Sequence, residues 1–162
     1  MKMTLDHKSL DSLSLDLVKQ HLMILDTADD TLIQAYMAAS LSAAEKYMHH
    51  PITSESYTSI VSDSYELPYQ PSNVYLYQDG VLVKEVCFKY LFPTLTIEPT
   101  DGVVFNSVKA DIQGINNAAI DQARLLLIGT NFRVRENEDF SNMREIPFGV
   151  SRLLDLNSKS FL

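Results

Sequence analysis

The chain has 162 residues, of which 46% are hydrophobic and 21% are charged, as expected for a single globular domain with a buried core. Its formal net charge of −8 argues against a general nucleic-acid-binding protein and a membrane-surface protein, because both usually present basic patches. The single cysteine excludes an internal disulfide, and the N-terminal stretch lacks the apolar run of a signal peptide. No stretch approaches the roughly 20 apolar residues of a membrane helix, so we expect a soluble protein made in a cytoplasm.

The N-terminal part predicts two helices, over 14–25 and 30–49. Ser12 or Ser14 can cap the first helix, because a serine hydroxyl accepts a hydrogen bond from a free N–H in the first turn. Small residues in the second helix would let another helix approach closely, and the expected neighbour is a later, central helix. The acids between the two helices lack the spacing of a calcium loop, and His49-His50 has no partner ligand, so no metal site or cofactor is predicted.

Residues 52–115 read as a β-rich insertion, with strands concentrated over about 73–105. Two β-rich runs flank Asp79-Gly80, which predicts a hairpin with a type I′ turn. Thr94–Ile97 and Val103–Phe105 suggest a second pair of strands. The single cysteine, Cys87, lies between valine and phenylalanine, so we expect a buried structural thiol rather than a nucleophile.

The densest aliphatic block of the sequence lies at the centre of a third helix, predicted over 117–138. Asn116 or Asn117 can cap this helix, and apolar residues on two adjacent stripes indicate that it is buried on several sides. A fourth, short helix is predicted over 148–156.

These elements predict a mainly α fold, a helical bundle of three to four helices that carries a β-hairpin-rich arm between the second and third helices. The single domain 1–162 then divides into a helical hairpin (1–51), the β-rich insertion (52–115), and a central helix with a C-terminal docking segment (116–162).

Short motifs recur in a defined order at both ends of the chain. The C-terminal motifs are Ala119-Ile120, Gln122-Ala123, Leu125 to Gly129, Arg135-Glu136, Ile146 to Val150 and Leu153-Leu154. The N-terminal motifs are Leu17 to Leu22, Asp29-Asp30, Ala38 to Ser40 and Ala43 to Tyr47. In their order and spacing these motifs resemble the head–tail connector (neck adaptor) proteins of tailed bacteriophages, and the resemblance is weak over residues 52–115.

The resemblance implies a structural virion protein that forms a twelve-fold ring beneath the portal. The ring would join the phage head to the tail and extend the channel through which DNA passes without specific binding. The implied partners are the portal protein, a tail-side neck protein (a stopper or tail-completion protein) and further copies of the chain. The implied location is the virion neck, after synthesis in the cytoplasm of the bacterial host.

Two surfaces are expected to carry this assembly. A charged end of the third helix, a candidate subunit interface, contains Arg133, Arg135 and Glu136. The candidate portal-docking segment contains Pro147, Phe148, Val150, Arg152, Leu153 and Leu154. Because this short segment is more apolar than an isolated terminal helix should be, it either docks on a partner or folds back on its own core. If it docks, truncation after Glu145 should leave a folded domain that no longer binds portal.

A second class of function stays open, namely a small cytoplasmic enzyme or regulatory binding module that shares only a helical core. The sequence contains no phosphate-binding loop, dinucleotide glycine pattern, zinc-protease motif or nucleophile elbow, so no catalytic residue is assigned and the protein is predicted not to be an enzyme. The size of the protein with and without a portal protein would separate the two classes.

Overall fold

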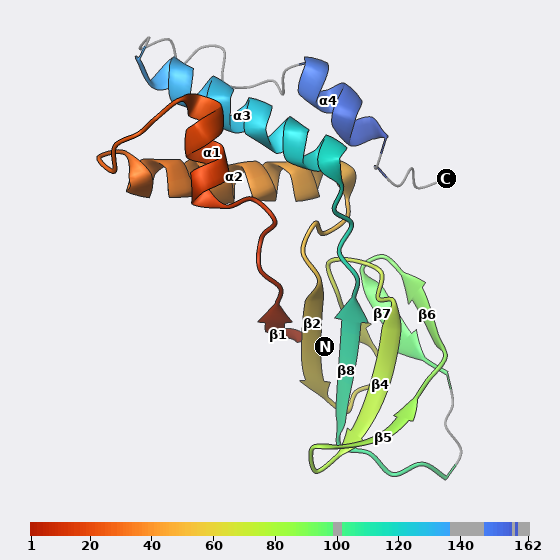
Figure 1. The fold of residues 1–162 in the computed structure, drawn as a ribbon. Coiled ribbons are helices and arrows are strands. Elements are labelled where there is room, and N and C mark those ends of the chain that lie inside the picture. Colours follow the sequence, from red (N-terminus) through yellow and green to blue (C-terminus); the bar gives the residue numbers. More distant parts are fainter. Residues whose placement is uncertain (99–101, 137–147, 157, 159–162) are drawn as a thin grey trace. The chain divides into compact units, whose positions relative to one another are not determined.

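The computed structural model describes residues 1–98, 102–136, 148–156 and 158, and it divides the chain into two compact units (Figure 1). The β unit comprises Met1–Leu10 and Thr53–Gly114, and the helical unit comprises Asp11–Ile52 and Ile115–Leu162. The sequence predicted that the first ten residues belong to the helical hairpin 1–51. In the structure they belong to the β unit. The assignment of the whole chain to one domain stays a prediction.

The β unit contains two antiparallel sheets. The larger sheet has the strand order β1-β2-β8-β4-β5. Its strands are β1 (Thr4–Lys8), β2 (Glu55–Ile60), β8 (Ser107–Ile112), β4 (Asn73–Gln78) and β5 (Val81–Glu85). The smaller sheet has the order β3-β7-β6, formed by Tyr65–Glu66, Thr94–Ile97 and Phe88–Leu91 respectively.

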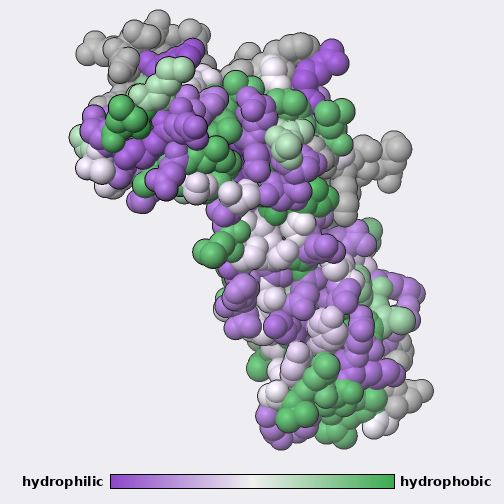
Figure 2. Space-filling view, viewed as in Figure 1, coloured by the Kyte–Doolittle hydropathy of each residue, from purple (hydrophilic) through white to green (hydrophobic). Residues whose placement is uncertain are grey.

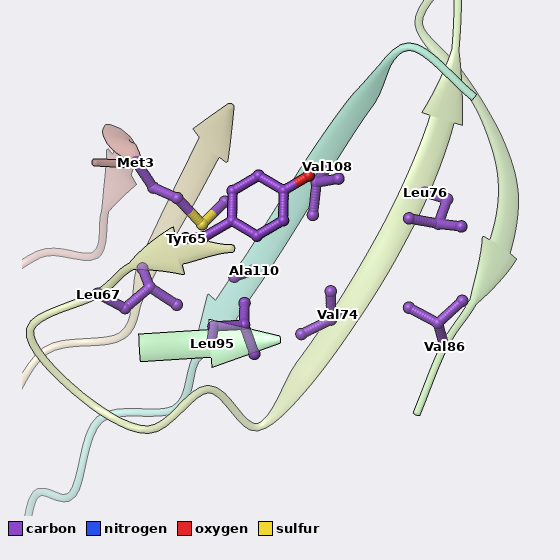
Figure 3. Packing of buried hydrophobic residues seen from close by; sticks show 9 residues of the cluster. All are labelled: Met3, Tyr65, Leu67, Val74, Leu76, Val86, Leu95, Val108 and Ala110. Atoms are coloured by element: carbon purple, nitrogen blue, oxygen red, sulfur yellow. The ribbon is translucent and has the colours of Figure 1, made fainter. Parts of the chain in front are cut away.

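Alternation along the strands builds the core of the β unit. In β8, Val108 and Ala110 are fully buried while Lys109 between them is only partly buried, as expected when successive side chains point to opposite faces. Figure 3 shows that the buried side chains of the two sheets face one another. The cluster contains Met3, Tyr65, Leu67, Val74, Leu76, Val86, Leu95, Val108 and Ala110. The unit is therefore a small β-sandwich.

The hairpin predicted around Asp79-Gly80 is confirmed. Gln78 pairs with Val81, and the two turn residues have φ angles of 52° and 81°, the positive values that a type I′ turn requires. The register shifts later in the same strand pair, which leaves Val83 without a partner across from it. The other edge strand, β1, shifts in the same way at Asp6.

Four helices form the helical unit within the described residues: α1 (Leu15–Leu22), α2 (Asp30–Met48), α3 (Ala118–Glu136) and α4 (Phe148–Asp155). The caps follow the sequence, because the Ser14 hydroxyl accepts from the N–H of Leu17 at 3.2 Å and the Asn117 side chain accepts from the N–H of Ala119 at 3.0 Å. Each of the four helices begins within two residues of its predicted first residue and ends within three residues of its predicted last residue.

The third helix is central, as predicted, because α3 packs against α1, α2 and α4. Two apolar stripes of α3 face two different clusters, but the second is not the predicted stripe of Ala119, Leu126 and Thr130, because Leu126 and Thr130 are exposed. One stripe joins residues of α2 and α4 in the cluster Ala44, Met48, Ile52, Ile120, Ala123, Leu127, Val150 and Leu154. The other joins residues of α1 and α2 in the cluster Leu13, Val18, Ile33, Leu125 and Ile128.

The prediction of a mainly α helical bundle is wrong. About 36% of the chain is helix and 28% is strand, and the described residues form two antiparallel sheets in addition to four helices. The prediction missed strands β1, β2, β3, β6 and β8. Serine and threonine in β2 resembled a loop, although the same segment contains Tyr57, Thr58 and Ile60, which favour strands.

Two local predictions in the insertion are also wrong. Val103–Phe105 is not a strand, and the neighbours of β7 are β6 and β3. Cys87 is exposed rather than buried. It lies between β5 and β6, where the buried side chain is that of the preceding Val86, so the apolar neighbours of the cysteine did not indicate its own direction.

The turn provides a test of the hairpin. We expect Gly80→Ala to lower the free energy of unfolding by about 1 kcal/mol, because the alanine backbone would have to adopt a positive φ. Its Cβ would meet no neighbouring atom within 4 Å, so a clash does not contribute. Chemical denaturation measures this change. Gly149→Ala is the matched control, since it lies in α4 with no neighbour within 4 Å and should stabilise slightly. Equal stability of the Gly80 variant and the wild type would contradict the turn assignment.

Candidate assembly surfaces

The C-terminal helix α4 packs into the helical unit through residues that were predicted to dock on a portal. Val150 is 1% exposed and Leu154 is fully buried, and both belong to the cluster formed with α2 and α3. Leu153 is partly buried against the same cluster. The hydroxyl of Tyr47 donates to Asp155 Oδ1 at 2.7 Å, which joins the end of α2 to the end of α4.

The other predicted docking residues lie elsewhere on the same segment. Arg152 is exposed on α4, Phe148 is the first residue of that helix, and Pro147 lies outside the described residues. The structure therefore separates the predicted set into an apolar face that packs on the helical core and an exposed basic residue. The docking role of the set stays a prediction.

The predicted subunit interface lies at the C-terminal end of α3. Arg133 is exposed, and Arg135 and Glu136 are the last two residues of the helix that the structure describes. A helix C-terminus carries a partial negative charge, so arginines are favourable there. The role of these three residues as an interface also stays a prediction.

A residue that the sequence analysis did not select carries the strongest polar contact of the helical unit. Arg124, in the middle of α3, is fully buried, and its two terminal nitrogens donate to the two carboxylate oxygens of Asp11. Planar, bidentate pairing of this kind is the strong form of an arginine–carboxylate contact. Ser12 next to it donates to Asp121 Oδ1 at 2.8 Å, and Leu13 is buried between α1 and α3. Residues 11–13 thus run along α3 as a strap.

The charge of Arg124 changes the titration of its partner. Burial alone would raise the pKa of the Asp11 carboxyl, but the hydrogen bonds and positive charge of Arg124 lower it below the ordinary value. The backbone N–H groups of Leu13 and Ser12 act in the same direction. The Nε of Arg124 is buried without a hydrogen-bond partner among the described residues. Among these residues, Asp11 alone therefore compensates the buried positive charge of the guanidinium.

One signal in the sequence pointed to this pair. Arg124 begins an otherwise aliphatic run on a helix that was already predicted to be buried on several sides. A charged residue at such a position needs a carboxylate nearby. Asp11 is 113 positions away, and no local pattern identifies it as that carboxylate.

Within the described part of the chain, no group of three or more histidine, cysteine, aspartate or glutamate side chains could hold a metal ion. Among the same residues, none of the helices combines the length and apolar character that a membrane crossing requires.

No protein-family model and no curated protein sequence matches the chain. Solved structures do. A chain from the neck of a native gene transfer agent particle, computed with C12 symmetry, superposes with a TM-score of 0.58 at 15% identity, covering 99% of this chain and 97% of the other. The chain has the fold of a particle-neck protein.

Two further structures share this neck fold. A chain from the neck of an empty gene transfer agent particle, computed with C6 symmetry, has a TM-score of 0.57 at 17% identity and covers 99% of this chain and 97% of its own length. A chain from the virion of the native particle has a TM-score of 0.56 at 17% identity, with 93% and 91% covered. The resemblance to neck proteins noted in the sequence is thus confirmed at the level of the fold. These neighbours come from particle necks and a virion, and at identities of 15% and 17% the likeness shows the fold alone.

The strap is testable by removing its charge. Asp11→Asn should lower the free energy of unfolding by about 3–5 kcal/mol, because Arg124 would stay buried without a compensating carboxylate. Urea denaturation at neutral pH measures the loss. Asp6→Asn, at an exposed position in β1, is the control and should change stability by less than about 0.5 kcal/mol.

The contribution of the Asp11–Arg124 pair to stability should also depend on pH. Because the pKa of Asp11 is lower in the folded protein, its stabilisation is fully present above the unfolded value near 3.8 and is lost as the pH falls through the folded value. Stability measured from neutral to acid pH should therefore fall less steeply in Asp11→Asn than in the wild type. An unchanged acid slope would show that the pair does not form.

The packing of α4 has its own test. Leu154→Ala should lower the free energy of unfolding by about 2–5 kcal/mol, because a fully buried leucine leaves a cavity. Leu156→Ala, at a residue that is 78% exposed in the same segment, should have little effect. Contrary to the earlier expectation, truncation after Glu145 should then destabilise the helical unit. If Leu154→Ala proves neutral, α4 is not part of the core and its apolar face is available for docking.

Proposed function

We propose that the chain is a structural protein of a phage or phage-like virion neck, where copies assemble as a ring beneath the portal and join the head to the tail. The observation that carries this proposal is the match over nearly the whole length of the chain to neck structures computed with C12 and C6 symmetry. A closed ring needs a heterologous contact in which one surface of a subunit meets a different surface of the next.

Charge supports the proposed position around a DNA channel. The chain carries a net charge of −8, whereas a basic lining would hold DNA phosphates through counterion release and impede sliding. The same net charge makes identical subunits repel one another. Exposed charge pairs at the Arg133 end of α3 would contribute roughly 1 kcal/mol or less each, which is too little to close a ring unaided. The portal is therefore the expected template.

The C-terminal segment is the proposed contact with the portal. Val150 and Leu154 are buried in the helical core, so in this arrangement the contact falls to the exposed side of α4, which includes Arg152. An arginine at that position can pair with a portal carboxylate in the planar manner that arginine favours. The tail-side neighbour in this proposal is a stopper or tail-completion protein.

The test combines the purified chain with portal rings from the same phage. Alone at micromolar concentration we expect a monomer or loose oligomer in sedimentation velocity, and with portal we expect a ring in negative-stain images. Arg152→Ala should weaken the complex without unfolding the chain, and Lys46→Ala, at an exposed position on α2, is the control. A chain that stays monomeric with portal at every concentration would count against the proposal.

A further inference from the structure

One end of the β unit carries a cluster of exposed apolar side chains that the folding of the unit does not use. Figure 2 shows this apolar area at the lower end of the unit in that view. We call the cluster the β tip, and it consists of the exposed Ile60, Val61, Val81, Leu82 and Val104 together with the half-buried Tyr77.

Strand pairing brings these residues together. Ile60 pairs with Ser107, Ser107 pairs with Tyr77, and Tyr77 pairs with Leu82, so one row crosses the four adjacent strands β2, β8, β4 and β5. Directly paired residues lie on the same face of a sheet. Because the next residue of β8, Val108, points into the sandwich core, this row lies on the outer face.

The remaining members flank the row. Val61 follows Ile60, and Val81 pairs with Gln78 beside the hairpin turn. Val104 lies two positions before Asn106, whose backbone N–H donates to the carbonyl of Tyr77 at 2.9 Å.

These side chains are far more exposed than core residues. Ile60 is 63% exposed, Leu82 is 53%, Val81 is 68% and Val104 is 74%, and none of them belongs to the buried clusters. Single exposed apolar residues are common, but a contiguous group from several strands marks an interaction site or an aggregation risk. Both outer strands of the sheet have register shifts, which disfavour simple addition of another strand. The side chains rather than the strand edge are therefore the contact surface.

Acidic side chains surround the β tip. Asp79 is exposed at the hairpin turn, where its carboxylate accepts hydrogen bonds from Asn106 at 2.7 Å and Gln78 at 3.1 Å but pairs with no cation among the described residues. Asp63 follows Val61 by two positions, and the exposed Glu85 pairs with Tyr75 in the next row, where Lys109 lies on the other side of Tyr75; together with Lys84 this makes three acids against two lysines. An apolar centre with an acidic margin complements a surface whose apolar centre is bordered by lysine and arginine.

We propose that the β tip docks a different protein of the particle, one that presents an apolar patch with a basic margin. This inference rests on the proposed neck function, since it takes the partner from the same particle. A tip-to-tip contact between two copies of the chain fits poorly, because it would bring Asp79 and Glu85 against their own counterparts. Apolar side chains would supply the affinity, and the acidic margin would select the partner.

The experiment measures binding of the full chain to two probes, tailless heads and headless tails purified from the phage that encodes it. The variant Ile60→Ser/Leu82→Ser removes two side chains of the apolar row, and Glu85→Lys reverses one charge of the margin. Leu25→Ser is the matched control, because Leu25 is 99% exposed in the helical unit. Circular dichroism and thermal unfolding confirm that each variant is folded.

The proposal predicts that the wild type and Leu25→Ser bind one of the probes equally well, while the double serine variant binds it about tenfold more weakly or worse. Glu85→Lys should weaken the same complex to a smaller degree. Wild-type binding by the double variant to both probes would overturn the inference and leave the neck function standing. If instead the double variant abolishes self-association of the pure chain, a second copy occupies the tip and the inference is wrong. Failure of the wild type to bind either probe would refute the neck function itself.

Discussion

The ion pair between Asp11 and Arg124 is the constraint on which the helical unit depends. Arg124 lies on α3 between the two apolar stripes that face the two clusters of the unit. A rotation or shift of α3 that moved the guanidinium from Asp11 would leave a buried charge without a partner, a state that costs several kcal/mol. The pair therefore restricts α3 to one register, and α3 is the helix that contacts all the others. The strap that holds it begins where the chain leaves the β unit, at Leu10.

Features determined by neighbouring residues could be predicted from the sequence. The helix caps at Ser14 and Asn117 and the turn at Asp79-Gly80 depend on side chains and φ angles within a few positions. The turn was predicted, and each cap was narrowed to two residues, Ser12 or Ser14 and Asn116 or Asn117. Strand β1 could not be recognised in this way, because its charged and polar residues form a strand only through pairing with β2, about fifty positions later. The partner of Arg124 was missed for the same reason.

The candidate surfaces show the same division. Apolar character and the resemblance to neck proteins together selected Val150 and Leu154 as docking residues. A short helix with one apolar face can also bury that face on its own core, and here it does. The surface apolar residues that remain, in the β tip, come from three strands and two loop segments, so no continuous segment of sequence displayed them as a group. The sequence could identify the apolar residues, but only the strand register shows which of them share an exposed face.

The connection between the units has a consequence for how such a chain can change during evolution. The chain leaves the helical unit at Ile52 and returns at Ile115, and the N–H of Ile115 donates to the carbonyl of Pro51 at 3.0 Å. Inside the β unit the same two passages continue as neighbouring strands, with Glu55 opposite Ile112. For α2 and α3, residues 53–114, which form the sandwich apart from its N-terminal residues, therefore act as a closed loop whose entropy cost depends only weakly on how many residues it contains. A sandwich attached in this way can be enlarged, reduced or exchanged for another while α2 and α3 keep their contact, so the surface offered to a partner can diverge faster than the helical scaffold.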